Sequence, residues 1–236
     1  MLEHLRLERP AEGVARLVLD NPSQRNAMSD QMTTSWRSAV EELSADRSVR
    51  VVVVTGEGTA FCSGGNTGWI ASEPEAEVDD LRERMMAFYR AWLSIRELEV
   101  PTIAAVNGHA IGAGLCLALA CDIRYAAAGA RLGVPFVKLG MHPGMAATYL
   151  LPNAVGAANA RELLLTGRTV EADEARQLGL VSRVFDSTDF EARVDEIAAG
   201  IAATAPIASR YTKWRCATAV IVTSSRACSG RHWHSR

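Results

Sequence analysis

The sequence predicts an α/β fold built on a mostly parallel sheet. Three observations support this prediction: strand-like segments recur along the chain, helical segments separate them, and glycine-rich turns join strands to the helices that follow. The composition agrees, because 48% of the 236 residues are hydrophobic and 22% are charged, as in a globular domain with a sizeable core.

The first part of the chain is predicted to form strands around one helix. Asn21-Pro22-Ser23 breaks the chain after the second strand, and Ser29 is a suitable N-cap for the helix. The run of valines around Val52 is typical of a strand that is covered on both faces. The expected elements are strands at 4–8 and 14–20, a helix at 29–43 and a strand at 50–55.

The rest of the chain alternates between helices and strands after a glycine-rich loop at 56–68 and an acidic loop at 72–80. The expected elements are a helix at 81–98, a strand at 102–106, a buried helix at 115–120, a strand at 122–126, helices at 145–155, 158–165 and 171–178, a strand at 181–185 and a helix at 191–203. Residues 101–121 carry no charge, but Pro101, Asn107 and several glycines favour a strand, a turn and a buried helix over a membrane span.

The composition and the cysteines exclude several classes of protein. A net charge of −2 and 6% aromatic residues argue against nucleic-acid binding. The five cysteines are odd in number and form no CxxC pair, so neither a disulfide framework nor a metal site is expected. The charged start of the chain lacks the apolar segment of a secretory signal, and we therefore expect a cytoplasmic protein.

Two glycine-rich turns, at 60–66 and 107–114, stand before helices and carry the chemistry. Either turn alone is explained by tight packing or by a generic anion site at a helix start. Together, they can supply one backbone N–H each to a single oxygen, which is an oxyanion hole. Neither turn contains the GxGxxG or GxxxxGK[ST] pattern of a nucleotide site.

Five ordered motifs give the chain a specific resemblance. They are Asn21-Pro22 with Asn26-Ala27-Met28, AFCSGGN at 60–66, NGHAIGAGLCLALACDIRYAA at 107–127, LGVPFVKLGMHPG at 132–144 and LLTGRTVEADEARQLGLVSRVF at 164–185. Over about residues 3–213 the chain resembles the crotonase family, the enoyl-CoA hydratase/isomerase superfamily.

This resemblance implies a spiral of ββα units with a helical C-terminal region, assembled as a homotrimer or a dimer of trimers. It implies an acyl-CoA thioester as the substrate and no separate cofactor, since coenzyme A is part of that substrate. The thioester oxygen would lie between the amides of Gly65 and Ala113. The substrate-binding positions implied by the resemblance are Gln24, Arg25, Ala27, Ser63, Gly64, Asn66, Trp69, Gly112 and Pro135. Asn66 replaces a usual aspartate, and Trp69 either walls the acyl pocket or belongs to the core.

The chain departs from the family at its acids. Hydratases of the family carry two glutamates, and those positions are Cys116 and Phe136 here. Cys116 is either a buried core thiol or a nucleophile. Some isomerases carry an aspartate at the position that is Gly144 here. His142 remains as a candidate general base, the alternative being a histidine bonded to a helix start, and His109 is interpreted as structural.

Two functions stay open. One is an enzyme that hydrates or isomerises enoyl-CoA thioesters through the oxyanion hole, with its hydratase activity in doubt. The other is a non-catalytic acyl-CoA-binding protein. An interaction module without a ligand ranks behind both.

The last residues, from Trp214, differ from the rest. They hold four arginines and no acid, so 1–213 carry −6 (21 basic and 27 acidic residues) and the tail carries +4. We expect an acyl-CoA-binding core at 3–200, the start of a helical region at 201–213 and an atypical tail at 214–236. A one-base deletion would explain this tail, because a permissible codon set read in the restored frame begins LALRDGG; the alternative is a divergent tail. A frameshifted tail would weaken the trimer.

Overall fold

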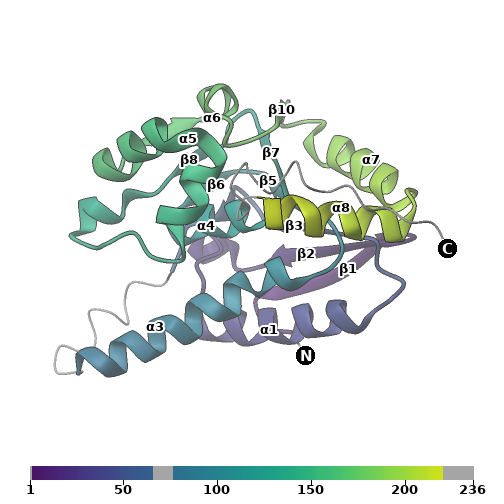
Figure 1. Cartoon of the computed structure of the whole chain (residues 1–236), viewed down its shortest axis with the longest axis horizontal. Coiled ribbons are helices and arrows are strands. Elements are labelled where there is room, and N and C mark those ends of the chain that lie inside the picture. The colour runs from purple at the N-terminus through teal and green to yellow at the C-terminus, as the bar shows by residue number, and fades with distance from the viewer. Residues whose placement is uncertain (1, 66–76, 220–236) are drawn as a thin grey trace.

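The computed structural model describes residues 2–65 and 77–219, which form two sheets with helices around them (Figure 1). The six-stranded sheet has the order β1 (Leu5–Ala11), β2 (Val14–Leu19), β3 (Val51–Gly56), β5 (Thr102–Val106), β7 (Ile123–Ala127) and β10 (Arg183–Phe185). The four-stranded sheet has the order β4 (Ala60–Cys62), β6 (His109–Ile111), β8 (Arg131–Gly133) and β9 (Thr169–Glu171). Within the described residues only β1–β2 and β8–β9 pair antiparallel, so the predicted α/β fold with mostly parallel strands is confirmed.

Three successive ββα units build the spiral that the resemblance implies. In each unit one strand joins the six-stranded sheet, the next joins the four-stranded sheet, and a helix follows. The units are β3, β4 and α3 (Val78–Leu93); β5, β6 and α4 (Ala113–Ala120); and β7, β8 and α5 (Ala147–Thr166). In the second unit the short strand leads almost directly into its helix, because β6 ends at Ile111 and α4 begins at Ala113.

The sequence does not predict the second sheet, which the structure adds to the fold. β4 lies within residues 56–68, which were expected to be a loop, and β6 lies within the second glycine-rich turn. Each strand of this sheet is only three residues long, so neither alternation nor an apolar run can reveal it.

Most predicted helices are found close to their expected bounds. α1 (Asp30–Ala45) begins as predicted at Ser29, whose hydroxyl accepts a hydrogen bond from the Met32 amide at 3.2 Å. The predicted break between helices at 155 and 158 is a kink in α5, where Gly156 has φ 76° and ψ 163°. α3 ends at Leu93, earlier than predicted, because a 3-10 turn at Ser94–Glu97 replaces its last turn. The remaining helices are α6 (Ala172–Leu178), α7 (Phe190–Ala202) and α8 (Pro206–Ala219).

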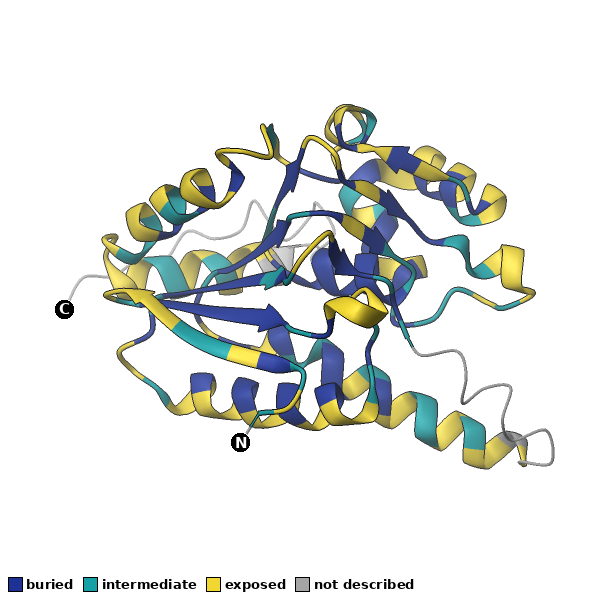
Figure 2. Ribbon diagram, turned by 180° about the vertical axis from the view of Figure 1, so that it is seen from behind, coloured by how far each residue is buried: buried dark blue, intermediate teal, exposed yellow. Residues whose placement is uncertain are grey.

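The six-stranded sheet is covered on both faces, as the valines of β3 predict. Val52 and Val54 pack on the side of α1 and α3, whereas Val51 and Val53 pack on the side of α7. The inner strands β2, β3 and β5 are accordingly buried along almost their whole length, whereas the edge strands β1 and β10 are mostly exposed or half-buried (Figure 2). Between α1 and α3, the stacked rings of Trp36 and Trp92 lie 4.8 Å apart.

Residues 101–121 form β5, β6 and α4, and no helix of the described residues is long and apolar enough to cross a membrane.

α8 passes through the boundary expected at Trp214 and ends at Ala219, while 220–236 lie outside the described residues. Lys213 holds α8 to the core, because its ammonium lies 2.9 Å from a carboxylate oxygen of Asp122 and 2.9 Å from the Val100 carbonyl.

Candidate functional site

The first glycine-rich turn follows β4 and is fastened to residues 24–28. The amide of Ser63 donates to the Arg25 carbonyl at 3.0 Å, and the amide of Met28 donates to the Gly64 carbonyl at 2.8 Å. The Ser63 hydroxyl also reaches the Gln24 carbonyl at 3.3 Å. The structure thus brings together Gln24, Arg25, Ala27, Ser63 and Gly64, with the side chains of Gln24 and Arg25 exposed.

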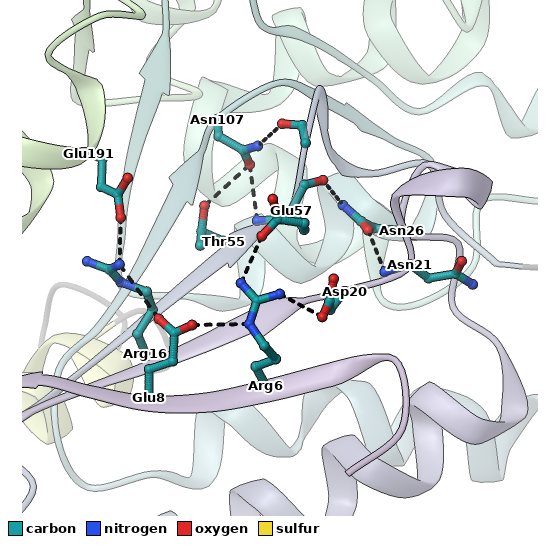
Figure 3. A network of polar contacts seen from close by, with 12 residues as sticks. Arg6, Glu8, Arg16, Asp20, Asn21, Asn26, Thr55, Glu57, Asn107 and Glu191 are labelled. Atoms are coloured by element: carbon teal, nitrogen blue, oxygen red, sulfur yellow. Dashed lines mark hydrogen bonds and ion pairs between the residues drawn. The ribbon is translucent and has the colours of Figure 1, made fainter.

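Two asparagines fix the loop at 56–60 that leads into this turn (Figure 3). Asn26 is fully buried, and its side-chain amide donates to the carbonyls of Glu57 at 2.9 Å and Ala60 at 2.7 Å. Asn107 accepts from the Gly56 amide at 3.1 Å and donates to the Gly58 carbonyl at 2.9 Å. These bonds satisfy loop backbone groups that would otherwise be costly to bury, and they hold the loop in one conformation.

The second turn ends at Gly112, whose φ of 58° and ψ of −122° favour glycine. α4 begins at the next residue, Ala113, and all eight of its residues are buried. The first N–H groups of a helix have no acceptor within it, and they carry the positive end of the helix dipole. The amide of Ala113 therefore belongs to a donor-rich helix start.

The two turns touch each other. A Cβ on Gly64 would lie 3.3 Å from the amide nitrogen of Ala113, and a Cβ on Gly114 would overlap the Cys62 carbonyl. Gly65 and Met28 are paired in an isolated parallel β-bridge. The hydrogen bond of this bridge runs from the Met28 amide to the Gly64 carbonyl, so it does not use the Gly65 amide. Gly65 and Ala113, the two predicted donors, consequently lie on adjoining turns.

The two positions without glutamates lie beside the start of α4. Phe136 belongs to a 3-10 turn at Pro135–Leu139, and its ring tip would be 3.9 Å from a Cβ on Gly112. Cys116 is one turn into α4, and its sulfur lies 3.9 Å from the Gly144 carbonyl. Pro135 and Phe136 are both half-buried. This part of the site is therefore lined by a phenyl ring and a thiol, with no carboxylate at either position.

Burial controls the chemistry of Cys116. It is fully buried, and this burial raises the pKa of the thiol to about 12. A thiol with such a pKa is protonated at neutral pH and is a poor nucleophile. The structure favours the core-thiol interpretation over the nucleophile interpretation.

Alkylation of the native protein tests this interpretation. At about pH 8 a thiol of pKa about 12 is roughly one part in 10⁴ thiolate, so iodoacetamide should leave Cys116 unmodified while labelling the exposed Cys216. Peptide mass spectrometry measures both positions, and labelling in denaturant controls for detection. Rapid labelling of Cys116 in the folded protein would show an activated nucleophile instead.

The remaining sequence candidates are placed differently. The side chain of His142 is exposed in the turn before α5. Packing therefore does not hold its imidazole against the two glycine-rich turns, and its role as a general base stays a prediction. His109 is also exposed, on β6. Asn66 and Trp69 lie outside the described residues.

Tyr89 is a candidate that the sequence reasoning missed. It is half-buried on α3, and a Cβ on Gly144 would overlap its phenol oxygen. Tyr89 directly follows Phe88, which faces the core together with Trp92 one helical turn later. The one signal for Tyr89 in the sequence is therefore that a tyrosine lies at the edge of a buried helix face.

A cavity of about 740 Å³ opens at the opposite end of α4, away from the two turns. It is lined by Asp122 and Arg124 after α4, by Tyr149 on α5 and by α8. Among residues 2–65 and 77–219, no cluster of His, Cys, Asp or Glu has the arrangement of a metal site.

Comparisons with known proteins give a consistent result. The family model described as enoyl-CoA hydratase/isomerase matches residues 9–229. The putative enoyl-CoA hydratase/isomerase YngF of Bacillus subtilis is 37% identical over 204 residues, which is 86% of this chain and 77% of that protein. A crystal structure of enoyl-CoA hydratase from Bacillus anthracis superposes with a TM-score of 0.88 at 31% identity, covering 94% of this chain and 85% of that one. A putative enoyl-CoA hydratase from Thermobifida fusca, solved in complex with CoA, gives 0.84 at 36% identity over 94% and 87% of the two chains.

Proposed function

The chain belongs to the enoyl-CoA hydratase/isomerase family, and on that premise we propose that it binds an acyl-CoA thioester and stabilises the enolate of its acyl group. The amides of Gly65 and Ala113 hold the thioester oxygen. The CoA complex of the Thermobifida fusca relative supports this choice of ligand class.

The contact between the two glycine turns is the observation that carries the proposal. Gly64 and Gly114 allow the turns to approach more closely than any side chain permits, which sets two backbone donors on adjoining segments. Backbone amides in such turns do not reorganise when negative charge develops on an oxygen, and this is what an oxyanion hole requires.

The residues that replace the glutamates shape the reaction. Phe136 has no proton to exchange, and the thiol of Cys116 stays neutral. We therefore place the reaction among those that need enolate stabilisation and one proton transfer, such as isomerisation, ahead of hydration. A non-catalytic acyl-CoA-binding protein is the second candidate, and the absence of carboxylates at Cys116 and Phe136 favours it.

The proposed ligand contacts outside the oxyanion hole are the exposed Gln24 and Arg25 with Ser63 for the CoA nucleotide, and Gly112 and Pro135 for the acyl group. The proposed assembly is a homotrimer or a dimer of trimers. The exposed apolar side chains of Ile207, Tyr211 and Trp214 on α8 support an assembly that covers them. The described cysteines are free thiols, which supports the cytoplasm as the proposed location.

Substitution of Ala113 by proline tests the oxyanion hole. Proline is tolerated at the first position of a helix, so α4 should form while the N–H at 113 is lost. We expect any acyl-CoA turnover to fall by about two orders of magnitude, since one donor contributes about 3 kcal/mol. Steady-state kinetics and calorimetric titration with crotonyl-CoA measure the effect.

Ala113→Gly is the matched control, because it also changes the side chain but keeps the amide. It should retain binding and any turnover. A folded Ala113→Pro variant with unchanged affinity and turnover would show that this amide is not a donor to the ligand.

A further inference from the structure

Two consecutive residues of α3 reach two parts of the candidate site, the first glycine-rich turn and the turn before α5. A Cβ on Gly65 would lie 3.8 Å from the ring tip of Phe88, which places that ring next to the first glycine-rich turn. The next residue, Tyr89, extends to Gly144 at the entrance of α5. Neighbouring residues of a helix point about 100° apart, so α3, which contacts α4, directs the phenyl ring and the phenol to different parts of the site.

The backbone around residue 144 is shaped to receive this phenol. A side chain at 144 would displace the phenol, since its first carbon would overlap the Tyr89 oxygen. The next two residues, Met145 and Ala146, adopt positive φ values of 49° and 55°, which non-glycine residues rarely do. The resulting turn directs the Met145 amide to the phenol oxygen. Strain of this kind concentrates at functional sites, where it fixes a group in place.

The surroundings keep the phenol protonated. Burial raises the pKa of Tyr89, and the hydrogen bond from the Met145 amide opposes this increase. Among the described residues, α4 faces the phenol with the neutral Cys116 thiol, and the turn before α5 carries the exposed His142. From α1, Arg37 reaches α3 at the Ala87 carbonyl, 3.1 Å away.

We propose that Tyr89 is the acid–base group of this site and that its phenol moves a proton at the α-carbon of the bound acyl-CoA. The inference rests on the proposed function, since the amides of Gly65 and Ala113 must hold the thioester oxygen. The carbonyl oxygen is then held at the first glycine-rich turn, near Phe88, and at the start of α4. Cys116, one turn into that helix, borders the phenol.

The proton transfer balances without a co-reactant. In one direction the phenol O–H bond breaks, the carbon–carbon electron pair of the enolate forms the new bond between the α-carbon and hydrogen, and the carbonyl double bond is restored. The phenolate that remains accepts the hydrogen bond of the Met145 amide and regains a proton from water. In the other direction the phenolate removes the α-proton, and the negative charge moves to the oxygen held by the two amides.

Exchange of α-hydrogens in D₂O tests the proposal with butyryl-CoA, which has no double bond to hydrate. The full chain should exchange the α-hydrogens, and its rate should rise about tenfold per pH unit from about pH 7 to about pH 9, because the base is a phenolate with a raised pKa. The rate without protein is subtracted at each pH. Tyr89→Phe should lower the protein-dependent rate by about 100-fold or more while leaving butyryl-CoA affinity within about twofold.

Tyr149→Phe is the control, since Tyr149 is an exposed tyrosine on α5 that lies outside the proposed site. It should exchange at the full rate. An unchanged exchange rate in a folded Tyr89→Phe variant overturns the proposal. A full chain that binds butyryl-CoA without exchanging its α-hydrogens also overturns it, and then only acyl-CoA binding remains. A full chain that does not bind butyryl-CoA overturns the proposed function and the role of Tyr89 together.

Discussion

Hydration of crotonyl-CoA by this chain is expected to be slower than hydration by a two-glutamate relative by about four orders of magnitude. Each positioned acid or base contributes about 10²–10⁴-fold to a reaction. Hydration needs one group to activate water and one to protonate the α-carbon, whereas Phe136 offers no proton and the Cys116 thiol has a pKa of about 12. Tyr89 supplies at most one of the two functions.

A steady-state assay with crotonyl-CoA, run beside a family member that keeps both glutamates, measures this difference. Turnover equal to that of the relative would contradict the expectation and would require another base. The pair His142→Ala and His109→Ala would then identify it, because both histidines are exposed and only the first lies in the turn before α5.

Replacement of Gly114 by alanine is expected to lower the free energy of unfolding by about 3 kcal/mol and to abolish acyl-CoA binding. The new Cβ would overlap the Cys62 carbonyl and lie 2.8 Å from its carbon. These are backbone atoms, so no side-chain rotation relieves the overlap, and α4 must move away from the first turn. Urea unfolding and calorimetric titration with crotonyl-CoA measure the two effects.

Gly200→Ala is the control for this substitution. Gly200 lies inside α7, and a Cβ there would meet no atom within 4 Å. Alanine forms helices better than glycine, so this variant should gain up to about 1 kcal/mol and keep its ligand affinity. Equal stability of Gly114→Ala and the original protein would mean that the two turns are not as tightly joined as the structure indicates.

The sequence predicts those parts of the fold that have a strong local signal. The valines of β3 indicate a strand with two covered faces, Ser29 marks the start of α1, and Gly156 marks the kink in α5. The strands of the second sheet have no such signal. β4 and β6 are three residues long and depend on pairing with each other, which is a property of the folded chain.

The same distinction applies to the site. The glycines at 64 and 112 sit in short motifs, so the sequence could place the turns and the amides of Gly65 and Ala113 beside helix starts. Tyr89 could not be found in this way, since the residue that accommodates it, Gly144, lies far along the chain. Histidine is a candidate base because this residue type titrates near neutral pH, but residue type alone does not reveal that the side chain of His142 is exposed.

The strand order of the two sheets has a consequence for synthesis on the ribosome. In both sheets the strands are arranged in the order in which they occur in the chain. A growing chain can therefore add each new strand to an edge that already exists, without waiting for a distant segment. Among the described helices, α7 and α8 reach back to earlier strands and loops, through Arg16 with Glu191 and through Lys213 with Asp122. These two helices thus pack onto a spiral whose strands can already be in place.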